Sequence, residues 1–284
     1  MSVSFLNPKV SIITVCLNSR NHLETAIKSV LSQTYKNIEY IVVDGGSADG
    51  TLDIIKKYED SIHSWSSGKD KSVFDAMNKG IEKTTGDILY FLNSDDYLIN
   101  NNVVEKAVEF FREKKDADLI YGDILYYNHK TKRQWPKRYP RKISKRHFLL
   151  DSIPHPATFF RSRCFKKAGC FNPDLKIAGD FEWFLRALYK YKLHSSYMGF
   201  TVCVFQLGGL SSNFNHAKKH LEEVKDAQRP YFSSIEIFFV HTLNFFLSGE
   251  IFRRIILFTT GRRMYSYLKD RKNRFTLLIT KRAT

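Results

Sequence analysis

Two adjacent carboxylates, Asp95 and Asp96, follow directly after a short apolar run at residues 88–92. The length of this run and the breaker Gly86 before it predict a buried strand. Open α/β sheets bind ligands beyond the carboxyl ends of their strands, so we expect the pair at a binding edge. Neighbouring carboxylates repel each other unless a cation joins them, and hard oxygen ligands favour Mg²⁺ or Mn²⁺ held together with substrate phosphates. Taken alone, the pair could also be a solvated turn.

Two further acidic residues occupy comparable places. Asp44 ends an apolar run at residues 38–43 and is followed by two glycines, which would let a flat ring approach the backbone. Asp180 follows Gly179 at the start of a predicted helix, whose N-terminus would keep a carboxylate ionised. Either side chain could instead cap a turn or a helix, and for Asp49 capping is the preferred interpretation.

The elements that must position these residues alternate regularly. Apolar runs predict strands, and a period of 3.6 residues predicts the helices between them. Strands are expected at residues 10–16, 38–43, 88–92, 119–126, 157–161 and 197–205, and helices at 21–33, 52–58, 72–83, 103–114 and 181–190. This alternation predicts an α/β fold with a doubly wound, mainly parallel sheet flanked by helices.

The composition is that of a globular protein. The 284 residues are 43% hydrophobic and 26% charged, which is enough to bury a full core and excludes wholesale disorder. The cysteines form neither a C-x-x-C pair nor a metal-ligand spacing, so reduced thiols in a cytosolic protein are expected. The N-terminus has neither a charged n-region nor an apolar h-region, and therefore no signal peptide is predicted.

The net charge of +16 is distributed unevenly. Residues 1–129 carry 14 Lys/Arg and 19 Asp/Glu, whereas residues 130–284 carry 31 and 10. This asymmetry predicts two zones, of which the second meets an anionic partner. Residues 130–146 contain nine basic residues and no acidic residue, and we expect them to form an irregular, mobile segment.

The chain changes character beyond residue 230. Residues 235–247 are apolar but too short to span a bilayer, and ten Lys/Arg follow among aromatic residues. The pattern predicts that residues 231–284 form a basic amphipathic appendage on an anionic membrane surface. The apolar side chains expected to enter that surface are Phe238, Phe239, Phe245, Phe246 and Phe252. The alternative is a helical cap that covers the main domain.

Several segments together resemble the family 2 glycosyltransferases, which are inverting enzymes with the nucleotide-sugar-binding GT-A fold. The first strand with residues 10–18 and the second strand with its loop, residues 38–51, carry the resemblance together with Asp95-Asp96. Further matching segments are residues 74–81, 155–160, 178–182 and 208–211, the last three resembling bacterial members that build polysaccharides. The resemblance covers residues 9–210 and implies a transferase domain at 1–230, with a donor-binding half at 1–129 and an acceptor half at 130–230.

The resemblance implies a donor site in the first half. Asp44 would accept the imide N–H of uracil, Asp95 would bind the ribose hydroxyls, and Thr14 would lie on the pocket floor. Lys79 would assist the diphosphate. Further donor contacts are expected from Asn18, Asp70 and Asn78. Thr14 could instead be a half-buried strand residue, and Lys79 a solvated helix residue.

The resemblance also assigns the metal and the base. Asp96 would hold a Mn²⁺ or Mg²⁺ ion that stabilises the departing diphosphate. Inversion needs a base that deprotonates the acceptor hydroxyl, and Asp180 matches the family's catalytic base, with Glu182 as its rival. Secondary candidates are Asp75 near the diphosphate, His155 on the acceptor side, Ser211 on a closing loop and His216 as an additional metal ligand. His155 could equally be a histidine that bonds the backbone.

These features predict a metal-dependent inverting glycosyltransferase. It would move a hexosyl or N-acetylhexosaminyl group from a nucleoside diphosphate sugar, with UDP expected, to a saccharide or polyprenyl-diphosphate-linked acceptor. The place would be the cytoplasmic face of the cell membrane, in cell-envelope glycan synthesis. The absence of a Q-x-x-R-W element and of a spanning segment disfavours a processive synthase. The alternatives are a basic nucleic-acid-binding protein, against which the sheet-edge acids argue, and a non-catalytic nucleotide-sugar-binding protein.

Overall fold

The computed structural model describes residues 7–208 and 217–248. These residues divide into two compact units, one of residues 7–142, 153–208 and 217–224, the other of residues 143–152 and 225–248. The boundary expected at residue 230 and the two halves expected within residues 1–230 stay predictions.

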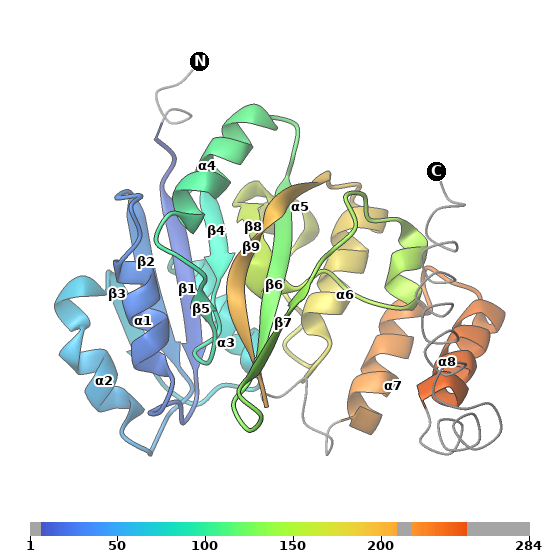
Figure 1. Cartoon of the computed structure of the whole chain (residues 1–284), viewed down its shortest axis with the longest axis horizontal. Helices are drawn as coiled ribbons and strands as arrows, with labels where there is room; N and C mark the ends of the chain where they lie inside the picture. Colours follow the sequence, from blue (N-terminus) through green and yellow to red (C-terminus); the bar gives the residue numbers. More distant parts are fainter. Residues whose placement is uncertain (1–6, 209–216, 249–284) are drawn as a thin grey trace. The chain divides into compact units, whose positions relative to one another are not determined.

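The first half of the sheet is parallel and carries the strands that precede the acidic loops. Its order is β3-β2-β1-β4, and every neighbouring pair in this part is parallel (Figure 1). The bounds are β1 (Val10–Cys16), β2 (Ile38–Asp44), β3 (Ser64–Ser67) and β4 (Ile88–Phe91). β1 and β4 are completely buried, as near-continuous apolar strands of a covered parallel sheet should be.

The second half of the sheet mixes directions. β8 (Thr158–Arg161) lies antiparallel between β4 and β6 (Leu119–Asn128), and β9 (Ser195–Leu207) runs parallel to β6. β5 (Tyr97–Leu98) then pairs antiparallel with β9. This pairing brings the residues just after β4 beside the end of β9, although more than 100 positions separate them in the sequence.

Helices cover the sheet through apolar stripes. In α1, Leu23, Ala26, Ile27 and Val30 are buried at the spacing of one helical face. The other helices of the main unit are α2 (Thr51–Lys57), α3 (Val73–Glu82), α4 (Val103–Glu113), α5 (Arg163–Ala168) and α6 (Gly179–Leu185), with α1 at Leu23–Leu31. A π turn, Arg186–Lys190, extends α6, and α7 (Ala217–Gln228) follows β9.

An aromatic cluster fixes the place of α6. Trp183 of α6 is fully buried, and its ring stacks on Phe165 and contacts Phe160 and Phe171 at centroid distances of 4.9–5.8 Å. Gly179 begins the helix against Phe74 of α3, where a Cβ atom would come within 2.6 Å of the phenyl ring. The helix start can therefore approach α3 this closely only with glycine at this position.

The basic segment at 130–146 is more ordered than the sequence predicts. Residues Arg133–Lys137 form β7, which pairs antiparallel with β6. The prediction of an irregular, mobile segment is wrong for this part, because Pro136 and the charges conceal the strand. β7 pairs only with β6, and an edge strand tolerates both proline and exposed charge.

The C-terminal unit contains the turn Lys145–Leu149 and α8 (Ser234–Ser248). Ile235, Phe238 and Phe239 are 80%, 71% and 60% exposed. No helix in residues 7–208 and 217–248 is long and apolar enough to cross a bilayer. The α/β fold with a mainly parallel sheet is confirmed; the strands that the sequence did not predict are β3, β5 and β7, which are short or polar.

Candidate active site

The site lies where the carboxyl ends of β1, β2 and β4 meet. Cys16 and Asp44 end β1 and β2 as register partners, and the loop Asn93–Asp96 leaves β4 at the same edge. The loop after β1 contacts both of the others: the N–H of Asn18 donates to the hydroxyl of Ser47 at 2.7 Å, and the hydroxyl groups of Ser19 and Ser94 lie 2.8 Å apart. The second contact joins the loop after β1 to the loop that carries the paired carboxylates.

Asp44 is the organising residue of the loop after β2. Its carboxylate is fully buried and accepts bonds from the backbone N–H groups of Gly46 and Ser47 at 3.1 and 3.0 Å. The hydroxyl groups of Ser47 and Ser67 also donate to it, at 2.5 and 2.6 Å. Burial alone would raise the pKa of Asp44, but these bonds outweigh it and lower the pKa. The residue is thus held as a carboxylate.

Asn18 belongs to the same loop system. It has a left-handed backbone (φ 50°), its Oδ1 accepts the Ala48 N–H at 3.0 Å, and its own N–H donates to Ser47. Asp49 accepts the Thr51 N–H at 3.0 Å, which confirms its role in a turn. Both residues shape the loop that follows β2 at this edge of the sheet.

Thr14 lies two residues before the end of β1, below the edge of the sheet. Its side chain is fully buried and accepts a hydrogen bond from the hydroxyl group of Tyr40 at 3.1 Å. In this structure Thr14 is packed as a core residue of the strand, and its place on a pocket floor stays a prediction.

Asp70 lies against the glycines that follow Asp44. A Cβ atom on Gly45 would be 3.2 Å from Oδ2 of Asp70, and that oxygen is buried without a hydrogen-bond partner in the described part of the chain. The other oxygen accepts from Lys79, which also pairs with Asp75 at 3.2 Å. The hydrogen bond to Asp70, and then that to Asp75, raise the pKa of Lys79, and partial desolvation of the ammonium group works against them. The unsatisfied oxygen of Asp70 faces the loop of Asp44.

Two predicted site residues have structural roles. Asn78 donates to the carbonyl of Phe171 at 2.9 Å and accepts its N–H at 3.0 Å, so both ends of the amide clamp the segment before α6. Binding of the donor by Asn78 stays a prediction, which would require the amide to form bonds besides those to Phe171. Glu182 forms a two-bond ion pair with Arg186, at 2.8 and 3.0 Å. The guanidinium group of Arg186 therefore already binds the carboxylate of Glu182, the alternative candidate for the base.

Asp95 and Asp96 differ in environment. Asp96 is 1% exposed, and it accepts the backbone N–H of Gln206 at 2.9 Å and the side-chain amide of Asn93 at 2.9 Å. Burial, followed by the neighbouring Asp95, raises the pKa of Asp96 well above its usual range. Burial also raises the pKa of Asp95. The pair is thus an uncompensated pair of acids.

These residues fit a divalent ion that brings most of its own ligands. The described residues contain no group of three or more His, Cys, Asp or Glu side chains placed to hold a metal. Mg²⁺ and Mn²⁺ are commonly bound by one or two carboxylates plus substrate phosphates and water, and Asp95 with Asp96 offers that donor set. An ion here would remove the repulsion between the two carboxylates.

Asp180 is joined to this loop by hydrogen bonds. Nδ1 of His155 lies 2.8 Å from Oδ2 of Asp180, and Nε2 lies 3.1 Å from Oδ1 of Asn93. Since Asn93 also donates to Asp96, the chain of bonds Asp180–His155–Asn93–Asp96 crosses the site. Both ring nitrogens of His155 thus bond side chains, in contrast to the alternative of a histidine that bonds the backbone.

The start of α6 is anchored from a second direction. Glu223 of α7 accepts the backbone N–H groups of Lys176, Ile177 and Ala178, at 2.9–3.0 Å. Sequence reasoning missed Glu223, Asn93 and Gln206. Asn93 belongs to the Asn-Ser-Asp-Asp motif, so its closeness in sequence to the paired carboxylates could have indicated a place in the site. Glu223 and Gln206 reach the site only through tertiary packing. Ser211 and His216 lie outside the described residues.

Comparisons with known proteins identify the family of the chain. Residues 11–170 match the model of glycosyl transferase family 2. An uncharacterised glycosyltransferase of Mycobacterium tuberculosis is 37% identical over 63% of this chain and 69% of its own length. The PGL/p-HBAD biosynthesis glycosyltransferase of Mycobacterium bovis is 32% identical over 72% of this chain and 80% of its own length.

Solved structures show the same fold. S. aureus TarS 1-349 with UDP-GlcNAc has a TM-score of 0.64 at 19% identity, covering 85% of this chain and 76% of its own. A mannosyltransferase of Pyrobaculum calidifontis with GDP-Man and Mn²⁺ has a TM-score of 0.59 at 14% identity, covering 95% and 81%. The family match and the curated relatives together establish that this chain is a glycosyltransferase and belongs to glycosyl transferase family 2.

Proposed function

We propose that the protein transfers a sugar from a nucleoside diphosphate sugar, with inversion, to a saccharide or lipid-linked acceptor of the cell envelope. The observation that carries the proposal is the hydrogen-bonded connection between Asp180 and the Asp95-Asp96 loop. An acid that can act as a base and an acid pair that can hold a cation are thereby fixed at one edge of the sheet. Both are needed when a diphosphate leaves as a hydroxyl group attacks.

The donor would rest on the loops after β1 and β2. The partnerless Oδ2 of Asp70 and the carboxylate of Asp95 could accept hydroxyl groups of the nucleotide sugar. Asp44 already accepts two serine hydroxyl groups, so reading the imide N–H of uracil requires it to exchange one of these bonds. TarS was solved with UDP-GlcNAc and the Pyrobaculum enzyme with GDP-Man. UDP is our proposal because Asp44, once it releases one serine hydroxyl group, can accept the imide N–H of uracil.

The chain's own residues would carry the proton. Asp180 would accept the proton of the acceptor hydroxyl while that oxygen attacks the anomeric carbon opposite the departing diphosphate. The bond from the anomeric carbon to the diphosphate breaks as the new glycosidic bond forms. A divalent ion bound at Asp96 would supply the charge that stabilises the leaving diphosphate. Glu182 is a poorer base candidate because Arg186 occupies it.

The acceptor side is proposed from the hairpin of β6 and β7. Trp135 is 42% exposed and its ring contacts Tyr126, which in turn contacts Phe205. Phe205 precedes Gln206, whose N–H binds Asp96, so the aromatic row leads to the metal candidate. Sugars pack on exposed aromatic rings, and the basic residues of the hairpin suit a diphosphate-linked acceptor.

Attachment to the cytoplasmic face of the membrane is part of the proposal. The exposed Ile235, Phe238 and Phe239 share one face of α8, and such a face can enter an anionic membrane surface. Full-length protein should therefore co-sediment with phosphatidylglycerol vesicles at low salt and be released as salt increases. Phe238→Ser with Phe239→Ser should weaken this binding. No sedimentation at any salt concentration would reject the membrane attachment.

The catalytic proposal is tested by a screen of nucleotide sugars for release of the nucleoside diphosphate, with Mn²⁺ and with EDTA. Asp180→Asn should keep the donor affinity and lower turnover by about 10²–10⁴-fold, because the amide cannot accept the proton. Glu182→Gln is the matched control on the same helix and should retain most of the activity. If Glu182→Gln were inactive and Asp180→Asn active, the roles would have to be exchanged.

A further inference from the structure

The direction of each hydrogen bond in the chain Asp180–His155–Asn93–Asp96 can be deduced. Nδ2 of Asn93 lies 2.9 Å from Oδ2 of Asp96, and an amide NH₂ group can only donate, so Asn93 is the donor in this bond. The carbonyl oxygen of Asn93 then faces His155, and the ring atom Nε2 must carry a hydrogen to bond it. The orientation of the amide thus determines the tautomer of the histidine.

The remaining ring nitrogen faces the base. Nδ1 of His155 and Oδ2 of Asp180 are 2.8 Å apart, so one proton lies between them. Oδ1 of Asp180 accepts the N–H of Phe181, at 2.8 Å. In the described part of the chain, His155 is the one side chain that hydrogen-bonds the Asp180 carboxylate. The ring therefore determines the rotation of this carboxylate.

His155 has little freedom of its own. Its side chain is 14% exposed, and it follows Pro154 in the short turn that leads into β8. Asn93 holds the far nitrogen, and the carbonyl oxygen of Pro156 accepts the hydroxyl group of Tyr90 at 2.6 Å. Glu223 holds the backbone at the start of α6 independently, so the helix does not depend on His155 for its position.

We infer that His155 is the positioning residue of the base: its ring orients the Asp180 carboxylate for the acceptor hydroxyl and ties it, through Asn93, to the loop of Asp96. This inference rests on the proposed function, in which Asp180 is the base. The proton of the acceptor goes to Asp180, and His155 keeps the protons it holds. Misplacement of a reacting group by about 1 Å can cost about 10²-fold in rate, which is the scale of the expected effect.

The test measures kcat, the acceptor KM and the affinity for the nucleoside diphosphate with Mn²⁺ in four proteins. His155→Ala should lower kcat by about 10–10²-fold and leave nucleotide affinity unchanged. His155→Asn places an amide near the position of Nδ1, can donate to Asp180, and should recover most of the loss. His155→Gln places its amide near Nε2, reaches Asn93 instead, and should stay as slow as His155→Ala.

A control separates positioning from the loss of a buried ring. His147 is 7% exposed, and its ring faces the carbonyl oxygen of Ser152. His147→Asn should change the melting temperature without lowering kcat of the folded protein. A loss of kcat in His147→Asn as large as that in His155→Ala would overturn the inference, because it would indicate a general effect of removing a buried histidine.

A double variant tests whether His155 acts through Asp180. Once Asp180→Asn has removed the base, adding His155→Ala should cause no further loss of kcat. Losses that multiply would overturn the inference, and so would parental kcat in His155→Ala beside an impaired Asp180→Asn. The latter result would leave the proposed function intact. Full activity in Asp180→Asn would instead reject Asp180 as the base and, with it, the role of His155.

Discussion

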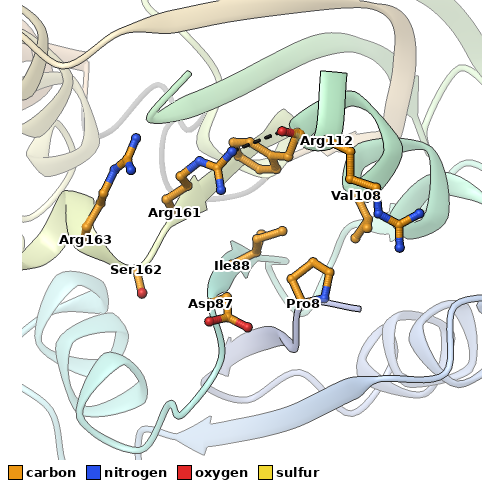
Figure 2. Close-up of a pocket in the computed structure, with 9 residues that line it drawn as sticks. Pro8, Asp87, Ile88, Val108, Arg112, Arg161, Ser162 and Arg163 are labelled. Atoms are coloured by element: carbon orange, nitrogen blue, oxygen red, sulfur yellow. Dashed lines mark hydrogen bonds between the residues drawn. The ribbon is translucent and has the colours of Figure 1, made fainter. Parts of the chain in front are cut away.

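The amino and carboxyl ends of the parallel strands differ in how far their charged side chains are paired. At the amino end, a cavity of about 170 Å³ beside the start of β4 and the end of β8 is rich in arginine (Figure 2). Arg161 donates to the carbonyl oxygens of Ala117 and Phe111, at 2.8 and 3.1 Å, and Arg163 pairs with Asp118 at 2.8 Å. The backbone N–H of Lys9 bonds Asp87. Charged groups here are satisfied within the chain.

At the carboxyl end, Asp44 accepts several hydrogen bonds and one oxygen of Asp70 pairs with Lys79, but the pair Asp95 and Asp96 is different. In residues 7–208 and 217–248, no lysine or arginine pairs with Asp95 or Asp96, and Oδ2 of Asp70 has no partner at all. Burial raises the pKa of both members of the acid pair. Paired charges at the amino end stabilise the fold. Unpaired buried acids at the carboxyl end lower the stability of the fold, and a bound cation would remove this free-energy cost.

The largest expected effect comes from neutralising the acid pair. Asp96→Asn should lower transfer by about 10²–10⁴-fold, because the ion that stabilises the leaving group loses its ligand. The same change should raise the free energy of unfolding of the metal-free protein, since it removes one of two repelling carboxylates. Activity assays and urea denaturation check the two parts. Equal activity of the parent in EDTA and in Mn²⁺ would contradict the metal role.

The pH dependence of stability should differ between parent and Asp96→Asn. The pKa of Asp96 is raised in the folded state, so the folded protein binds more protons than the unfolded chain. The stability from this group is present below the unfolded pKa of about 3.9 and is lost as pH rises through the folded pKa. Urea denaturation without metal should show the parent losing stability relative to Asp96→Asn as pH rises. A constant difference would refute the raised pKa.

At the opposite edge, a change should affect stability alone. Asp118 accepts the side chain of Arg163 and the N–H of His194, at 2.8 and 2.9 Å. Asp118→Ala should therefore lower the free energy of unfolding by about 0.5–1.5 kcal/mol, because it removes two hydrogen bonds whose donors lie on exposed residues. Below the melting temperature, kcat should equal that of the parent. A large loss of kcat would show that the two edges are coupled.

The smallest expected effect concerns the acceptor surface. Trp135→Ala should raise the acceptor KM by about 2–10-fold, which corresponds to about 0.5–1.5 kcal/mol for the loss of one aromatic contact. Donor affinity and the melting temperature should change little, since Trp135 is substantially exposed. Exposed Leu221→Ala on α7 is the control. An unchanged KM with several saccharide acceptors would remove Trp135 from the acceptor site.

Much of the site could be predicted from short stretches of sequence, because an acidic residue directly after an apolar run indicates the end of a buried strand. Asp44, Asp95 and Asp96 all lie at the predicted edge, and Asp49 has the predicted turn role. Thr14 and Asn78 could not be judged in this way. A polar residue in a strand or helix looks the same in sequence whether it faces a ligand, bonds Tyr40 or clamps Phe171.

The sequence by itself determined the strand and helix periods, the glycines beside Asp44 and the acidic residues that end the strands. Only the tertiary structure decided which of these residues meet. The direction of a hydrogen bond between Asn93 and His155, 62 positions apart, depends on how β8 inserts between β4 and β6. Periodicity reports a residue's local face, whereas a site is made by contacts between distant segments, and these arise only when the sheet assembles.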